Sequence, residues 1–169
     1  MAEDVKEQLL RYLSDAHAAE VGGLTSLKDL VEGTSDPNVQ QVVAEHITVT
    51  HSQIERLEAR IEALGGSKSE GKGLLNTIIG KGSDLLNIFH SHEDKQTQDL
   101  IKAYSLEHFE VGMYMSLEAY ADAIGDTETA RLATAFIAEE QMAAERVSRL
   151  IPEVAISALK NSEGTPSAA

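Results

Sequence analysis

Four long blocks of this sequence place apolar residues every three or four positions, and this spacing is the feature that most limits how the chain can fold. It is the period of an amphipathic α-helix, whose apolar stripe must be buried against other elements. Asp36 and Pro37 form an N-cap followed by a first-turn proline, which starts the second helix. Gly65 and Gly66 end that helix, and Asp126 caps the fourth. We therefore predict an all-α protein.

The predicted helices fit a single domain. They cover, approximately, residues 4–32, 37–64, 94–125 and 127–151. Pro152 ends or kinks the fourth helix, and a short last helix, PEVAISALKN, follows it. A chain of 169 residues that is 42% hydrophobic can form one domain with a real core. We assign residues 1–161 to a helical bundle and expect a disordered tail over 162–169.

The two halves of the chain resemble each other. HAAEVG at 17–22 returns as EHFEVG at 107–112, and at this offset of ninety positions at least nine residues meet identical ones. This is about three times the number that chance would give, so we infer an internal repeat. Two helical hairpins joined by a long crossover are typical of a four-helix bundle. The crossover makes the first and third helices antiparallel, so a pseudo-two-fold axis can bring Glu20 and Glu110 face to face.

Several glutamates and two histidines interrupt the apolar stripes at one level of the predicted bundle. Ionised carboxylates in an apolar interior cost several kcal/mol each unless a cation or good hydrogen bonds offset the cost. Oxygen and imidazole donors without sulfur suit iron or manganese, and the chain has no cysteine. Of the two adjacent glutamates on the fourth helix, only one need turn inward. The candidate metal ligands are Glu20, Glu107, Glu110, Glu139, Glu140, His46 and His17.

Simpler interpretations compete with the metal site. A lone glutamate on a helical stripe more often lies at its edge, with the carboxylate reaching water. His46 and His17 could be core histidines that hydrogen-bond a neighbour or orient a ligand instead of binding metal directly. His90 and His92 could hold a metal only with a third donor, which the sequence does not indicate.

Charge and motifs exclude several classes of function. A formal charge of -14 disfavours nucleic acid and membrane surfaces as partners. The chain has no apolar run of about 18 residues and no signal peptide, so we predict a cytoplasmic location. No nucleophile elbow or phosphate-binding glycine loop is present, and enzymatic activity is left open. The apolar residues within 74–89 indicate either a dimer contact or a cover for one flank of the bundle.

Three stretches carry a resemblance to a known family. They are LSDAHAAE at 13–20, EHITVTHSQIERLE at 45–58 and LEHFEVGMYMSLEAYADAIGDTETA at 106–130. They resemble the ferritin-like YciE/YciF stress-protein family, and the YciE branch most. The resemblance covers about residues 5–160. It implies a rubrerythrin-like bundle, a homodimer, a role in bacterial stress responses and a di-metal carboxylate site.

Carried over position by position, the family's site falls on some of the same residues. Its first-helix glutamate matches Glu20, its third-helix pair matches Glu107 and Glu110, and its fourth-helix pair matches Glu139 and Glu140.

The sequence departs from the family at two places. The family's acidic residue on the second helix is replaced by Thr48 and Val49, and the aspartate that some relatives carry on the fourth helix is Ala144. A site short of two anionic donors would bind metal more weakly, hold one ion instead of two, or lie empty.

Two hypotheses about function follow. The chain is a cytoplasmic stress protein that binds iron or manganese, or it is a metal-free structural or interaction protein that kept the bundle.

Overall fold

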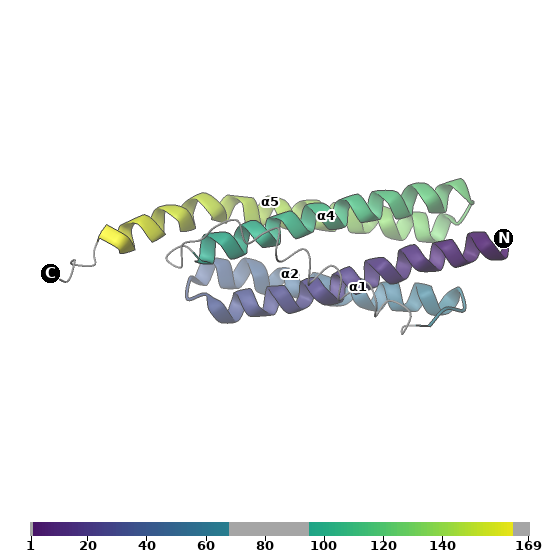
Figure 1. The fold of residues 1–169 in the computed structure, drawn as a ribbon, viewed down its shortest axis with the longest axis horizontal. Helices are drawn as coiled ribbons and strands as arrows, with labels where there is room; N and C mark the ends of the chain where they lie inside the picture. Colours follow the sequence, from purple (N-terminus) through teal and green to yellow (C-terminus); the bar gives the residue numbers. More distant parts are fainter. Residues whose placement is uncertain (1, 68–94, 164–169) are drawn as a thin grey trace.

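Four long helices make up the part of the chain that the computed structural model describes, residues 2–67 and 95–163. No strand occurs in these two ranges, as the sequence predicts. Of the predicted tail 162–169, residues 162 and 163 belong to the last helix and 164–169 lie outside the described ranges, as does the apolar segment 74–89. The helices, labelled as in Figure 1, are α1 (Glu3–Gly33), α2 (Pro37–Ala63), α4 (Lys95–Ala123) and α5 (Thr127–Glu163).

The helix ends lie where the capping residues predict them. The Asp36 carboxylate accepts hydrogen bonds from the backbone N–H groups of Asn38 and Val39, and Pro37 occupies the first turn of α2. Gly65 and Gly125 follow α2 and α4 with φ angles of 76° and 77°. This left-handed conformation favours glycine and closes a helix by satisfying its last carbonyl groups.

The helices form two antiparallel hairpins, α1 with α2 and α4 with α5, which lie side by side (Figure 1). Contacts at both ends show that α1 and α4 are antiparallel. At one end Gln96 donates a hydrogen bond to the Thr34 hydroxyl. At the other end the Tyr120 hydroxyl donates to the Val5 carbonyl over 3.2 Å. The antiparallel orientation predicted from the long crossover is therefore confirmed.

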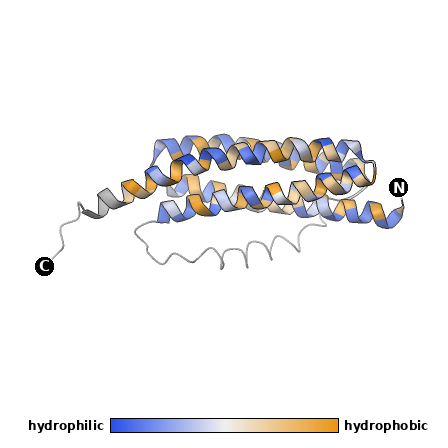
Figure 2. Ribbon diagram, turned by 90° about the horizontal axis from the view of Figure 1, so that it is seen from above, coloured by the Kyte–Doolittle hydropathy of each residue, from blue (hydrophilic) through white to orange (hydrophobic). Residues whose placement is uncertain are grey.

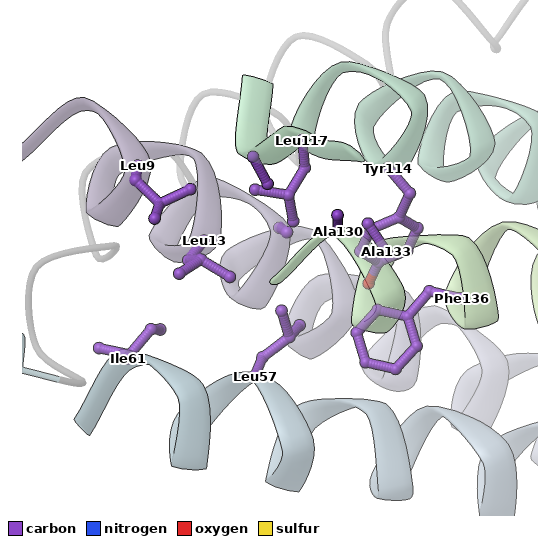
Figure 3. Close-up of a cluster of buried hydrophobic side chains, with 11 residues drawn as sticks. Leu9, Leu13, Leu57, Ile61, Tyr114, Leu117, Ala130, Ala133 and Phe136 are labelled. Atoms are coloured by element: carbon purple, nitrogen blue, oxygen red, sulfur yellow. The ribbon is translucent and has the colours of Figure 1, made fainter. Parts of the chain in front are cut away.

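Two apolar clusters fill the ends of the bundle. Hydrophobic and hydrophilic residues alternate along each helix, as amphipathic helices require (Figure 2). The first cluster, part of which Figure 3 shows, includes Leu13, Leu57 and Phe136. The second cluster includes Leu27 and Val43. Each fully buried aliphatic or aromatic side chain contributes about 1.5–3 kcal/mol, so these clusters stabilise the bundle on both sides of a more polar central layer.

The last helix is longer than the sequence predicts. α5 continues through Pro152 to Glu163, so the expected short C-terminal helix is the end of α5 and not a separate element. Proline removes one backbone hydrogen bond within a helix. Continued packing offsets that loss, because Leu150 and Val154 on either side of the proline are buried in the second apolar cluster.

An ion-pair network joins the C-terminal end of α2 to the start of α5. Arg60 donates to both oxygens of Asp126 over 2.7 Å and to the Thr129 hydroxyl over 2.8 Å. Asp126 also accepts the Thr129 backbone N–H as an N-cap. Burial alone would raise the pKa of Asp126, but the hydrogen bonds from Arg60 and Thr129 outweigh it and lower the pKa.

We expect Asp126→Ala to lower the free energy of unfolding by about 2 kcal/mol, because it removes an N-cap and a bidentate ion pair. Urea denaturation at neutral pH measures the loss. Since the folded pKa of Asp126 is depressed, the difference from the parent protein should vanish as pH falls through that pKa. Glu128→Ala is the control, because Glu128 also pairs with Arg60 but is 75% exposed and should cost less than about 1 kcal/mol. Equal losses in the two variants would contradict this assignment.

Among the described residues, no helix is long and apolar enough to cross a membrane.

Candidate metal centre

Five acidic or imidazole side chains occupy the central layer between the two apolar clusters. They come from all four described helices, since α1, α2 and α5 each provide one and α4 provides two at adjacent turns. Each is at least 93% shielded from solvent. They are Glu20, His46, Glu107, Glu110 and Glu140.

These side chains form two groups that share one carboxylate. His46, Glu107 and Glu140 form a group that we call the imidazole triad, and Glu20, Glu110 and Glu140 form a second group, the oxygen triad. Within each triad, one potential ligand atom per residue lies within 4.8 Å of the other two. The His46 Nε2 atom lies 2.9 Å from Glu107 Oε2 and 3.7 Å from Glu140 Oε2. Because Glu140 belongs to both triads, two cations bound there would be neighbours.

Neighbouring side chains fix the carboxylates in place. The Tyr114 hydroxyl donates a hydrogen bond to Glu20 Oε1, and the Gln53 amide donates to Glu140 Oε1. Gly23 lies where α1 approaches α4 closely. A Cβ atom at Gly23 would stand 3.3 Å from Glu110 Oε1 and 3.2 Å from the Leu106 side chain. Because glycine has no side chain, position 23 leaves space for the Glu110 carboxylate.

Without a cation, the buried layer favours neutral side chains. Burial is the main cause that raises the pKa of Glu20 to about 8 and that of Glu140 to about 9. Burial also raises the pKa of Glu107 to about 7 and that of Glu110 well above its ordinary range, with the charges of neighbouring glutamates adding to the effect at Glu110. The pKa of His46 is lowered, again mainly by burial. The neutral imidazole is the form that binds metal ions.

The donor atoms present fit divalent cations. Glu107 Oε1, Glu110 Oε1, Glu140 Oε2 and Gln53 Oε1 are buried without a hydrogen-bond partner. In the described ranges, no lysine or arginine forms an ion pair with Glu20, Glu107, Glu110 or Glu140. Buried polar atoms are nearly always satisfied, so these oxygens need either a cation or protons shared between neighbouring carboxyl groups. Four ionised carboxylates would balance the charge of two divalent cations.

Two of the predicted ligands lie elsewhere. His17 is half-buried, and its Nε2 atom lies 3.2 Å from Glu58 Oε1, outside both triads. Glu139 points toward Arg56, with 2.5 Å between Arg56 Nη2 and Glu139 Oε2. Of the adjacent pair on the fourth helix, Glu140 turns inward and Glu139 does not. The prediction that only one of the two would face the interior agrees with this arrangement.

Three residues of the layer were absent from the predicted ligand set. They are Thr50, Gln53 and Tyr114, and all three are at most 2% exposed. A signal was present for Gln53, because it stands seven residues after His46 and so returns to the same face of the helix. The offset of ninety aligns Thr50 with Glu140 in sequence. The position where α2 lacks a carboxylate is therefore the buried Thr50, and not Thr48 or Val49, which are exposed and partly buried.

Fold and site together define a class of protein, a ferritin-like four-helix bundle with carboxylates and an imidazole buried at its centre. The chain belongs to the family described as "Domain of unknown function (DUF892)", which matches residues 4–160. Protein YciF of Escherichia coli (strain K12) is 24% identical over 139 residues, which cover 81% of this chain and 84% of YciF.

Solved structures share the fold. The structure of YciF, described as an Escherichia coli stress protein, aligns with a TM-score of 0.71 at 22% identity, over 97% of this chain and all of the other. A protein of Xanthomonas campestris pv. campestris aligns with a TM-score of 0.78 at 20% identity, over 95% of this chain and 99% of the other. A Bacillus anthracis structure described as ferritin-like, diiron-carboxylate proteins aligns with a TM-score of 0.69 at 19% identity, over 89% and 99% of the two chains.

Proposed function

We propose that this chain is a ferritin-like protein that binds two divalent cations, iron or manganese, in the centre of its bundle. The observation that carries the proposal is the pair of buried triads that share Glu140. Glu20, Glu107, Glu110, Glu140 and His46 would hold the ions. The diiron-carboxylate description of the similar Bacillus anthracis structure supports the same conclusion.

Bound iron or manganese would supply one-electron chemistry toward dioxygen or peroxide. The chain's own residues would position and shield that chemistry. Tyr114 holds Glu20 by a hydrogen bond, and its ring packs against Phe136 with 4.9 Å between centroids. This aromatic pair is at most 1% exposed and separates the central layer from the apolar end of the bundle. Such a shield excludes water from the buried carboxylates.

A role in the stress response, a cytoplasmic location and a homodimer form part of the proposal. The similarity to YciF, whose structure is described as that of a stress protein, supports the first. The closer likeness to the YciE branch and the location stay predictions from the sequence. Light scattering tests the dimer, and a mass of one chain, near 18.2 kDa, would contradict it.

A second candidate function is a metal-free structural or interaction protein. It is favoured by α2, which places Thr50 and Gln53 in the central layer and contributes no carboxylate to either triad. Under this hypothesis the glutamates are protonated and hydrogen-bond with each other and with Gln53, and the layer needs no cation.

Metal analysis separates the two functions. Untagged protein, grown with added iron or manganese and desalted without chelator, should carry one to two equivalents of either metal per chain by mass spectrometry. A folded protein that is metal-free, and that takes up no Fe²⁺ under anaerobic conditions, would refute the metal-binding function and favour the second candidate. Circular dichroism on the same sample confirms that the protein is folded.

A further inference from the structure

The two triads differ in the chemistry of their donors. The imidazole triad offers one nitrogen and two carboxylates, whereas the oxygen triad offers carboxylates alone. The two positions therefore present different ligands to a cation, although they share Glu140 and lie in the same buried layer.

The internal repeat explains why the imidazole triad and the oxygen triad have different donors. At the offset of ninety, Glu20 corresponds to Glu110, and these two meet in the oxygen triad. His46 corresponds to Phe136, which is fully buried and packs against Tyr114 in the first apolar cluster. A phenyl ring thus fills the position where symmetry would put a second imidazole. Within the described ranges, one position has a nitrogen donor and the other has none.

On α2, Gln53 and Thr50 bring neutral oxygens to the buried layer and no second imidazole. The Gln53 amide nitrogen is occupied by its hydrogen bond to Glu140 Oε1, while Gln53 Oε1 is buried without a partner. The Thr50 hydroxyl is also buried without a partner. These neutral oxygens come from α2 in place of a further carboxylate or imidazole. They increase the number of hard donors in the layer without adding charge.

Ligand type determines which ion each position prefers. Imidazole suits iron, whereas carboxylate, carbonyl and water oxygens suit manganese. Fe²⁺ generally binds more tightly than Mn²⁺ to the same ligands, and its advantage is smallest where nitrogen is absent. Resting on the proposed function, we propose that the centre takes two different ions, iron in the imidazole triad and manganese in the oxygen triad.

The test loads metal-free, full-length protein anaerobically with Fe²⁺ and a roughly tenfold excess of Mn²⁺, removes free metal, and measures both metals per chain. Electron paramagnetic resonance of Mn²⁺ reports on its ligands independently of any activity. We expect one iron and one manganese per chain.

Three variants assign the positions. His46→Gln should lower the affinity for iron by more than about tenfold and leave manganese bound, because it removes the nitrogen donor. Glu20→Gln should lower the affinity for manganese and leave iron bound. The amide oxygen of the glutamine can still accept the hydrogen bond from Tyr114. His51→Gln is the matched control, since His51 is exposed on the same helix as His46 and should change neither metal. Thermal melting of the metal-free variants checks that each one folds.

Two outcomes would overturn the inference while leaving the proposed function intact. One is two irons per chain in the parent protein despite the manganese excess. The other is a parallel loss of both metals in His46→Gln and Glu20→Gln. A parent protein that binds neither metal would instead refute the inference together with the proposed function.

Discussion

Glu140→Gln is expected to abolish the binding of both cations, with a loss of affinity greater than about 100-fold. Glu140 is the carboxylate that both triads share, so its replacement leaves each triad with two of its three residues. Loss of a residue that only orients a metal ligand already costs about 10–100-fold, and a shared ligand should cost more. Equilibrium dialysis with Mn²⁺, followed by metal analysis, measures the loss.

The sequence provides a matched control in the preceding residue. Glu139 has the same chemistry on the same helix, but it pairs with Arg56 and is 30% exposed. Glu139→Gln should therefore leave metal binding within about twofold of the parent protein, since a partly exposed ion pair contributes little. Stoichiometric binding that survives Glu140→Gln would show that the cations bind elsewhere and not between the four helices.

The metal-free protein should lose stability as pH rises from 6.5 toward 9. The pKa values of Glu107, Glu20 and Glu140 are raised from an ordinary 4.5 to about 7, 8 and 9. In this range the unfolded chain has released these protons while the folded protein retains many of them, so a higher pH favours unfolding. Each carboxyl group that stays protonated in the folded protein but is ionised in the unfolded chain lowers the free energy of unfolding by about 1.4 kcal/mol for every unit by which pH rises. The loss between pH 6.5 and 8 should therefore be at least about 2 kcal/mol.

His46 does not interfere with this pH window. Its pKa is lowered from 6.5, so the stability linked to it is lost only as pH falls below the ordinary value. As pH rises above 6.5 the imidazole becomes neutral in the unfolded chain as well as in the folded protein, so the glutamates dominate the trend.

Urea denaturation in the presence of EDTA at several pH values measures the trend. The double variant Glu20→Gln, Glu110→Gln should show a flatter dependence, because two of the protons that the folded state retains are gone. With Mn²⁺ in place of EDTA the slope should reverse, since metal binding requires ionised carboxylates and strengthens with pH. A metal-free protein whose stability is constant from pH 6.5 to 8 would show that the four glutamates are not held neutral.

Most of the fold could be predicted from the sequence because its signals are local. Asp36 and Pro37 fix the start of α2 through bonds within one turn, and Asp126 does the same for α5. The end of α5 could not be predicted in this way. The packing of Val154 keeps the helix intact beyond Pro152, and that packing depends on residues far away in the sequence.

The candidate site was predictable where a whole helix face indicated it. Glu107 and Glu110 lie on a stripe of α4 that the structure buries, and the repeat links Glu110 to Glu20. On α1, Glu20 is buried as predicted, whereas His17 is not part of the buried face. The structure buries Leu9, Ala16 and Glu20, so His17 falls at the edge of the stripe, where it meets Glu58.

The second helix shows why periodicity alone could not give the full site. Neighbouring residues on a helix are about 100° apart, so a stripe defined by three or four apolar side chains can be rotated by one position. On α2 the apolar side chains of Ile47 and Ile54 are only partly buried, whereas the polar side chains of His46 and Gln53 beside them are buried. Partners on other helices, Glu107 and Glu140, determine that rotation. The pattern of apolar residues along one helix contains no information about such partners.

The covalent connection between the two hairpins affects how such a centre can evolve by mutation. If the bundle were assembled from two identical hairpins, every substitution would appear twice, and Thr50 could not differ from Glu140 at corresponding positions. In a single chain each half varies separately. One half can therefore keep three carboxylates, Glu107, Glu110 and Glu140, while the other keeps Glu20 and His46. Fusion of the repeat is what makes an asymmetric centre accessible to single mutations.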